Sequence, residues 1–221
     1  MKRLLVVGLL AFAAFSPIAA CADLTVTQII TMTLPGRAGS TSQPVTQTLR
    51  EISYLRDGVQ RVDTCRGVDA PPHSSAIFDK VRHRRIVINW ADRTYYMGVW
   101  NPKKQPQTNT ADLSMSFKPT GKSKMICGYS TREYAESMSG SMLQHKTIGM
   151  TEWVAMGLPG DIRNDSFGGP PGPGGMTLEA SFGVGHLTTL SVKSGRLPDS
   201  TFSPALTGLK RLTDLANVFA F

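Results

Sequence analysis

Apolar and polar residues alternate over much of the chain, a pattern typical of half-buried β-strands. In LTVTQIITMTL, residues 24–34, Val26, Ile30 and Met32 point to one side, and threonines occupy most of the other. Threonine is common in strands and suits a face in contact with water. The segment therefore predicts a strand with one buried face.

Further strands are predicted in pairs that flank turn residues. Residues 45–56 and 58–65 alternate on either side of Asp57-Gly58, a dipeptide favoured in hairpin turns. Similar patterns predict paired strands at 86–90 with 95–100 and at 178–182 with 187–192, and short strands at 113–118 and 124–130. Evenly spaced strands with turns between them favour an antiparallel sheet that curls toward a barrel or sandwich.

Helical patterns are few. Residues 206–219 place leucines at the spacing of an amphipathic helix, which we expect to cap the sheet rather than to bind a partner or membrane. Residues 138–156 fit either a turn or two of helix or a strand. The predicted fold class is therefore mainly β (α+β), with a few covering helices.

The first 22 residues have the layout of a secretory signal peptide. Lys2 and Arg3 precede an apolar run over 4–15, which is shorter than the roughly 20 residues that cross a bilayer. We expect residues 1–22 to be a leader and 23–221 a single domain. Within it, GGPPGPGG at 168–175 predicts a flexible loop.

Two processing routes are open at the end of the leader. Residues 18–21 resemble a bacterial lipobox, which would leave Cys21 acylated and the protein anchored to a membrane. Ala20-Cys21-Ala22 is also an A-x-A site with cleavage before Asp23. Because a strand begins at Leu24, an acylated Cys21 would leave almost no flexible chain between the membrane and the folded domain. We expect a periplasmic or secreted bacterial protein, with lipid anchoring as the alternative.

Charge and cysteine content add two expectations. The formal net charge is +8, but export makes a nucleic-acid partner improbable, so we interpret the basic run at 80–85 as a solvated loop; contact with an anionic lipid or polymer is the alternative. Cys65 and Cys127 would pair readily in an oxidising compartment. Two intervening strands would nevertheless separate them by about 14 Å, whereas a disulfide needs Cα atoms within about 7 Å. The pairing stays open.

Motifs that carry catalysis are missing from the sequence. It has no G-x-S-x-G, H-E-x-x-H or C-x-x-C motif and no phosphate-binding glycine loop. The histidines, at 73, 83, 145 and 186, show no metal-ligand spacing. We therefore predict no catalytic residue, metal site or cofactor, although a hydrolase with a triad assembled from distant positions remains an alternative.

One segment resembles a known signature. TGKSKMICGYSTREY, residues 120–134, is similar to a motif of exported bacterial domains of unknown function that are related in fold to the periplasmic lipoprotein carriers and receptors, the LolA/LolB-like group. The matching positions are Gly121, Lys124, Ile126, Gly128, Tyr129 and Tyr134. Ser123 replaces a threonine, and Cys127 stands where a small residue is usual. A closing Leu-Pro-x-Ser-x-Phe pattern matches at 197–202.

The resemblance implies a strongly curved antiparallel sheet, an open half-barrel whose apolar cavity is partly covered by helices. Candidate cavity residues are Met32, Ile88, Trp90, Met97, Trp100 and Phe182; alternatively, these residues pack against one another as core. We expect a non-enzymatic envelope protein that binds a lipid, an acyl chain or another apolar ligand. A scaffold with a filled core that binds another envelope protein is the main alternative.

Overall fold

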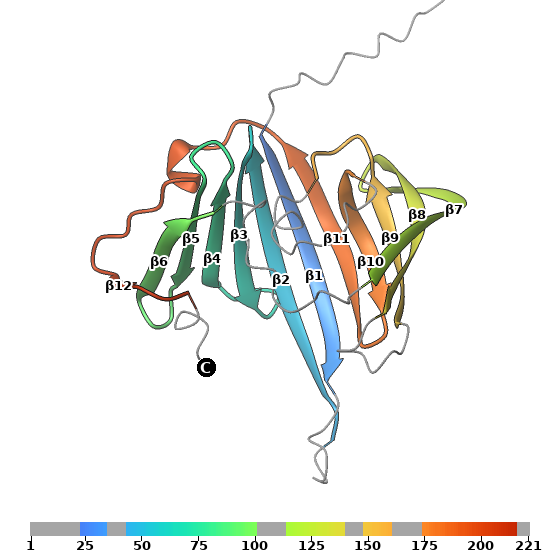
Figure 1. Ribbon diagram of the computed structural model, residues 1–221, viewed down its shortest axis with the longest axis horizontal. Helices are drawn as coiled ribbons and strands as arrows, with labels where there is room; N and C mark the ends of the chain where they lie inside the picture. The colour runs from blue at the N-terminus through green and yellow to red at the C-terminus, as the bar shows by residue number, and fades with distance from the viewer. Residues whose placement is uncertain (1–22, 35–42, 101–113, 140–147, 161–173, 216–221) are drawn as a thin grey trace, which may run out of the picture.

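The computed structural model describes residues 23–34, 43–100, 114–139, 148–160 and 174–215, which form one twelve-stranded sheet (Figure 1). The strands are β1 (Leu24–Leu34), β2 (Val45–Arg56), β3 (Val59–Arg66), β4 (Pro72–Asp79), β5 (Arg84–Asn89), β6 (Thr94–Val99), β7 (Ser114–Ile126), β8 (Tyr129–Ser139), β9 (Ile148–Ala155), β10 (Met176–Phe182), β11 (Gly185–Ser194) and β12 (Lys210–Leu212).

The sheet consists of two antiparallel meanders joined at its centre. Its strand order is β12-β6-β5-β4-β3-β2-β1-β11-β10-β9-β8-β7. The meanders β1–β6 and β7–β11 meet where β1 pairs with β11, from Leu24 opposite Ser194 to Met32 opposite Gly185. Only β12 is parallel to its neighbour, β6. The central pairing thus joins residues far apart in the sequence.

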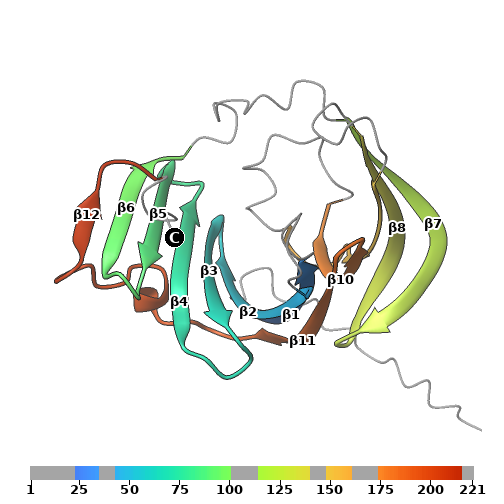
Figure 2. The same cartoon turned by 90° about the horizontal axis from the view of Figure 1, so that it is seen from below.

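The sheet is strongly curved, with β12 and β7 at its two rims (Figure 2). Register shifts occur in several strand pairs, including β1 with β11 between Thr27 and Gln28 and β10 with β9 between Thr177 and Glu179. Bulges of this kind bend a strand and increase its twist. The curvature gives the sheet a concave inner face and a convex outer face.

The expectation of an α+β fold with covering helices is wrong. No α-helix occurs among the residues described; the one helical segment within them is a short 3-10 turn, Asp199–Thr201. The helix predicted from residue 206 is instead a turn followed by strand β12. The Leu209 amide donates to the Leu206 carbonyl and so closes the turn. Gly208, at φ +80°, has a backbone conformation that no α-helix contains. Residues 216–219 of that prediction lie outside the described chain.

Most of the predicted strands are confirmed, including 24–34 as β1 and residues 114–118 of the strand predicted at 113–118, which belong to β7. Asp57-Gly58 forms the β2–β3 turn as predicted. The predicted strand at 124–130 is wrong, because Cys127 (φ 50°) and Gly128 (φ 83°) turn the chain between β7 and β8. Two successive positive φ angles are typical of a tight two-residue hairpin. Strands β4 and most of β8, whose residues are more polar, were not predicted.

Both faces of the sheet carry packed apolar residues. On the outer face Ile77, Ile86 and Ile88 form a buried cluster, and the half-buried Leu206 and Leu209 pack on it. A second buried cluster joins Leu24, Val26 and Leu55, which lie on the inner face at the start of the sheet's central strands, to residues of β9, β10 and the turn after β9: Ala155, Leu158, Met176 and Leu178. Apolar packing on both faces therefore stabilises the sheet.

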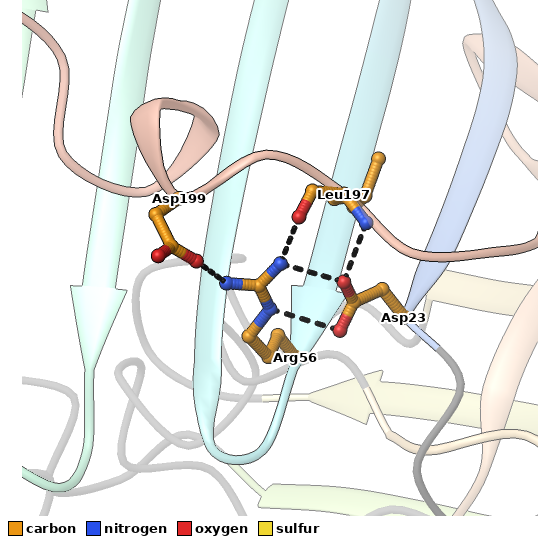
Figure 3. Close-up of polar contacts among 4 residues, drawn as sticks. All are labelled: Asp23, Arg56, Leu197 and Asp199. Carbon is orange, nitrogen blue, oxygen red and sulfur yellow. Dashed lines mark hydrogen bonds and ion pairs between the residues drawn. The ribbon is translucent and has the colours of Figure 1, made fainter.

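Residues 195–209, which we call the C-terminal strap, run from the end of β11 across the outer face to β12 (Figures 1 and 2). Arg56, at the end of β2, holds this segment (Figure 3). Its guanidinium donates to Asp23 at 2.7 and 2.9 Å, to Asp199 at 2.5 Å and to the Leu197 carbonyl. The Arg56 contact also lowers the pKa of Asp23. The start of β1 and the strap are thereby fixed to the same side chain.

Candidate functional site

Residues from five neighbouring strands form one row on the inner face. Glu136 pairs with Met150, Met150 with Phe182, Phe182 with Gly185, and Gly185 with Met32. Residues directly opposite each other on paired strands share a face of the sheet. A second row on the same face consists of Tyr134, Glu152, Ala180, Leu187 and Ile30.

Both rows lie on the opposite side of the sheet from the strap. Ile30 and Met32 are even-numbered residues of β1, whereas Asp23, which contacts the strap, is odd-numbered. Successive side chains of a strand point to opposite faces. Figure 2 shows the strap on the convex side, so the rows belong to the concave side.

The apolar side chains of these rows are only half-buried. We call them the inner apolar face; its members are Ile30, Met32, Phe117, Met150, Ala180, Phe182 and Leu187. Phe117 joins the set because it pairs with Glu136 from β7. By comparison, Ile88 in the outer cluster is 0% exposed. Contiguous apolar surface that remains partly accessible commonly marks a binding surface.

Glu136 is a buried carboxyl group within this apolar setting. Only 8% of the residue is exposed. Burial, and then the negative charge of Glu152, raise the pKa of Glu136 to about 7. Among the described residues, no hydrogen bond or positive charge offsets these two effects. Buried ionisable groups with strongly shifted pKa values are concentrated at functional sites.

Glu152 is the second carboxyl group of the site. Its Oε2 accepts a hydrogen bond of 2.8 Å from Thr177 Oγ1, while its Oε1 is buried and has no partner among the described residues. Burial raises the pKa of Glu152, and the Thr177 hydrogen bond opposes this rise. A buried polar atom without a partner costs about 1–3 kcal/mol. The pair thus has unused hydrogen-bonding capacity, which a bound group could satisfy.

Acidic residues on the other side of the same strands are paired with lysines. Glu133 on β8 accepts from Thr120 and forms an ion pair with Lys122, and both contacts lower the pKa of Glu133. Glu179 on β10 pairs with Lys124 at 2.8 Å. Glu133 is as buried as Glu136, at 8% exposed. Glu136 and Glu152 therefore differ from these neighbours in charge compensation, since no lysine among the described residues pairs with either of them.

The predicted cavity residues divide between the two faces. Ile88, Trp90 and Met97 meet in the outer cluster beneath Leu206 and Leu209, as packed core. Trp100, which is fully buried, packs edge-on against Phe78, at 5.5 Å between ring centroids. Phe78 alternates with Ile77 of the outer cluster along β4 and so lies on the opposite face.

Met32 and Phe182 are the two predicted residues that lie on the inner apolar face, on either side of Gly185. A Cβ at Gly185 would lie 2.5 Å from the Phe182 ring, so the ring covers this glycine. Sequence reasoning missed Glu136, Glu152, Phe117 and Met150. Their strands lack a clean apolar alternation, and only the register of β8 with β9 places the two glutamates together.

Cys65 and Cys127 are both free thiols. Cys65 is buried on β3, whereas Cys127 is exposed and its Sγ contacts the Thr189 carbonyl of β11 at 3.5 Å. Strands β1 and β2 separate β11 from β3. With strand spacings near 4.8 Å, the two thiols are about 14 Å apart along the sheet, which is too far for a disulfide.

The signature residues make structural contacts. Ile126 and Tyr129 pack against the buried cluster that contains Leu24 and Ala155, beside the Cys127-Gly128 turn, and Gly121 has φ +83° next to a register shift in β7. Lys124 lies 4.1 Å from the Trp153 ring centroid. The remaining member, Tyr134, contacts the Met156 sulfur at 4.0 Å. Cys21 and residues 168–173 lie outside the described residues.

One serine–histidine contact bears on the hydrolase alternative. Ser181 Oγ lies 3.0 Å from His186 Nδ1 on the exposed β10–β11 hairpin. Among the described residues no carboxylate is hydrogen-bonded to this ring, as a triad requires. His145 lies outside the described residues. The described chain also contains no group of three or more acidic, histidine or cysteine residues that could hold a metal ion.

No protein-family model and no curated protein matches this chain. Within the described residues, no helix is both long and apolar enough to cross a membrane. The fold and site together define an all-β protein, built on one curved open sheet, that carries a buried and a half-buried carboxyl group, Glu136 and Glu152, within an apolar inner face.

Proposed function

We propose that this protein is an exported cell-envelope protein without enzymatic activity that binds a lipid, an acyl chain or another apolar molecule on the concave side of its sheet. The observation that carries the proposal is the inner apolar face, whose half-buried side chains come from β7, β9, β10, β11 and β1. A curved sheet presents such side chains toward a common space, as a ligand of apolar character requires.

The distribution of core residues supports this proposal. Ile77, Ile86 and Ile88 are buried under the strap on the outer face. Leu24, Val26 and Leu55 are buried on the inner face nearer the start of β1. These clusters supply the packing that stabilises the sheet, so Met32 and Phe182 are not needed for it. Half-buried apolar side chains outside the main core are available for binding.

The start of the fold supports secretion over lipid anchoring. Asp23 is bound through its side chain to Arg56 and to the Leu197 amide, and its carbonyl accepts from Gly195. Cleavage before Asp23 would leave a mature chain whose first residue is already part of the fold. An acylated Cys21 would hold this end of the sheet within two residues of the membrane. The intact mass of the mature protein distinguishes the two forms.

Native mass spectrometry and lipid extraction of protein purified from envelope fractions test the proposal. We expect wild type to carry an apolar molecule, and a double variant, Met32→Ser with Phe182→Ser, to carry much less while remaining folded. Val81→Ser, on an exposed turn, is the matched control and should retain the molecule. Wild-type protein that consistently carries no apolar molecule would contradict the proposed binding function.

One observation favours a scaffold as the second candidate. β7 forms a rim of the sheet and is thirteen residues long, so its outer edge can pair with a strand from another envelope protein. Pro119 and Lys118 within β7 are residues that commonly protect edges from such pairing. Crosslinking in envelope fractions followed by purification would show a stable protein partner and no lipid if this candidate is right.

A further inference from the structure

We infer that the molecule bound on the inner face is an amphiphile with a positively charged amine, whose ammonium group lies between the carboxylates of Glu136 and Glu152. This inference rests on the proposed function and specifies the chemistry of its ligand. It follows from the geometry of the two glutamates, from the groups around them and from the apolar residues beside them.

The two glutamates are diagonal neighbours on adjacent strands. Glu136 lies opposite Met150, and Glu152 is two residues further along β9. Diagonal positions of this kind are about 7–8 Å apart in an antiparallel pair. Charge-assisted hydrogen bonds from an ammonium to a carboxylate are about 2.8 Å long. One ammonium between the side chains can therefore reach an oxygen of each glutamate.

Few described groups on this side could satisfy the carboxylates. The neighbours of the pair are apolar on β7 (Phe117), β9 (Met150) and β10 (Ala180 and Phe182), apart from Thr177, which donates to Glu152. Tyr134 lies opposite Glu152 and two residues before Glu136 on β8, and its hydroxyl is directed to Met156. Arg132, the basic residue on this side of β8, is exposed and shifts the pKa of neither glutamate.

An ammonium group supplies what this environment lacks. It brings a positive charge and three hydrogen-bond donors, and one of these can reach the buried Oε1 of Glu152, for which the described part of the chain supplies no partner. An anionic head group would be repelled by the two carboxylates, and a hydroxyl would satisfy one oxygen without compensating charge. Burial strengthens the interaction because charges attract more strongly in a low dielectric.

The apolar part of such a molecule has a continuous path away from the glutamates. Met150, Phe182 and Met32 follow Glu136 along one row, and Ala180, Leu187 and Ile30 follow Glu152 along the other. Four strand spacings separate β8 from β1, or about 19 Å measured along the sheet. An alkyl chain lying across the strands would contact both rows.

Isothermal titration calorimetry with three probes of equal chain length tests the inference: dodecylamine, dodecanol and dodecanoate, each below its micelle concentration. The proteins are wild type, Glu136→Gln with Glu152→Gln, and Glu133→Gln as the control from the other side of β8. At about pH 8 the amine is charged. The formal net charge of +8 opposes non-specific attraction of a cation, so a preference for amine must arise locally.

We expect wild type and the Glu133→Gln control to bind dodecylamine at least about tenfold more tightly than dodecanol, with dodecanoate weakest. The double variant should lose about tenfold or more in affinity for the amine and keep its affinity for the alcohol. If the double variant does not fold, wild type provides a second readout: its amine affinity should fall as the pH decreases below about 7, where Glu136 takes up a proton.

Equal affinities for amine and alcohol in wild type, tighter binding of dodecanoate, or unchanged amine affinity in the folded double variant would each overturn the inference while leaving apolar binding intact. Failure of all three probes to bind would instead contradict the proposed function, and the inference with it.

Discussion

Glu136 shows at the scale of one residue how position changes the chemistry of a carboxyl group. On the same strand Glu133 pairs with Lys122, whereas Glu136 is buried among apolar side chains and shares its surroundings with Glu152. Burial disfavours the charged form of an acid. The pKa of Glu136 is therefore raised to about 7. Glu133 is equally buried, but its contacts with Thr120 and Lys122 outweigh burial and lower its pKa.

Glu136→Gln should make stability less dependent on pH. Because the pKa of Glu136 is about 7 when folded and near 4.3 in an unfolded chain, its contribution is complete below pH 4 and is lost as the pH rises through 7. Urea unfolding at about pH 8 should show the variant more stable than wild type by about 1–3 kcal/mol, with little gain at about pH 4. An equal change in unfolding free energy at both pH values would contradict a raised pKa for Glu136. Glu133→Gln should bring no such gain.

The two cysteines should differ in reactivity without ever forming a bond to each other. Cys127 is exposed in a hairpin turn and Cys65 is 0% exposed on β3. Accessible thiols react much faster than buried ones. Brief alkylation of the native protein, followed by mass spectrometry of its peptides, should therefore modify Cys127 alone, and unfolding should make Cys65 reactive. Recovery of a Cys65–Cys127 disulfide peptide would show that the strand order is wrong.

At the scale of elements, tight turns determine how strands pair. Cys127 and Gly128 both have positive φ angles and set the register of β7 with β8. That hairpin places Ile126 and Tyr129 against the buried cluster that contains Leu24 and Ala155, and it places Phe117 opposite Glu136. A local backbone conformation thus positions one rim of the site.

Gly128→Val should destabilise the protein by about 2 kcal/mol or more, because a β-branched residue is strained at φ +83°. Its chain neighbours aside, no described heavy atom lies within 4 Å of an added Cβ, so the expected loss comes mainly from the backbone conformation. Gly183→Val is the matched control: this turn glycine also has open space but does not have a positive φ. Thermal unfolding should show a clear loss for the first variant and a much smaller one for the second.

Arg56→Met should release the C-terminal strap without unfolding the sheet. The substitution removes the hydrogen bonds to Asp23, Leu197 and Asp199 while keeping an apolar side chain near the Phe202 ring, which lies 4.8 Å from the guanidinium. Hydrogen exchange should accelerate about tenfold or more in residues 195–202 and remain unchanged in β8 and β9. Uniform acceleration through all strands would indicate a global role instead.

At the scale of the whole molecule, the two faces of the sheet differ in how closely their apolar side chains are packed. Ile88 lies in the closed outer cluster beneath Leu206 and Leu209, and Met32 lies on the half-buried inner apolar face. The curvature of the sheet, together with the strap on its convex side, separates these environments (Figure 2).

Ile88→Ala and Met32→Ala should therefore have different consequences. Ile88 is 0% exposed, and truncating a buried isoleucine costs about 2–5 kcal/mol. Met32 is partly exposed, so its truncation should cost about 1 kcal/mol and reduce the lipid recovered with the protein. Urea unfolding and lipid extraction of both variants check the division. A larger stability loss for Met32→Ala would show that the inner apolar face is core.

The site was predictable only in part. Met32 and Phe182 stand out because they belong to clean alternating segments, and their placement on one face follows from strand geometry. Glu136 and Glu152 give no local signal, since each is an ordinary polar residue of its own strand. Their proximity depends on the register of β8 with β9, and their burial depends on the curvature of the whole sheet.

The sequence alone determined the hairpins, because alternation and turn residues such as Asp57-Gly58 act over a few neighbouring positions. Tertiary structure decided the pairing of β1 with β11, the extended course of residues 206–212 and the meeting of the two glutamates. The leucines at 206, 209 and 212 have helical spacing. In the structure, however, Leu206 and Leu209 pack on the outer cluster, and Leu212 belongs to β12, which pairs with the edge of β6. Burial against distant residues overrode a weak local preference for helix.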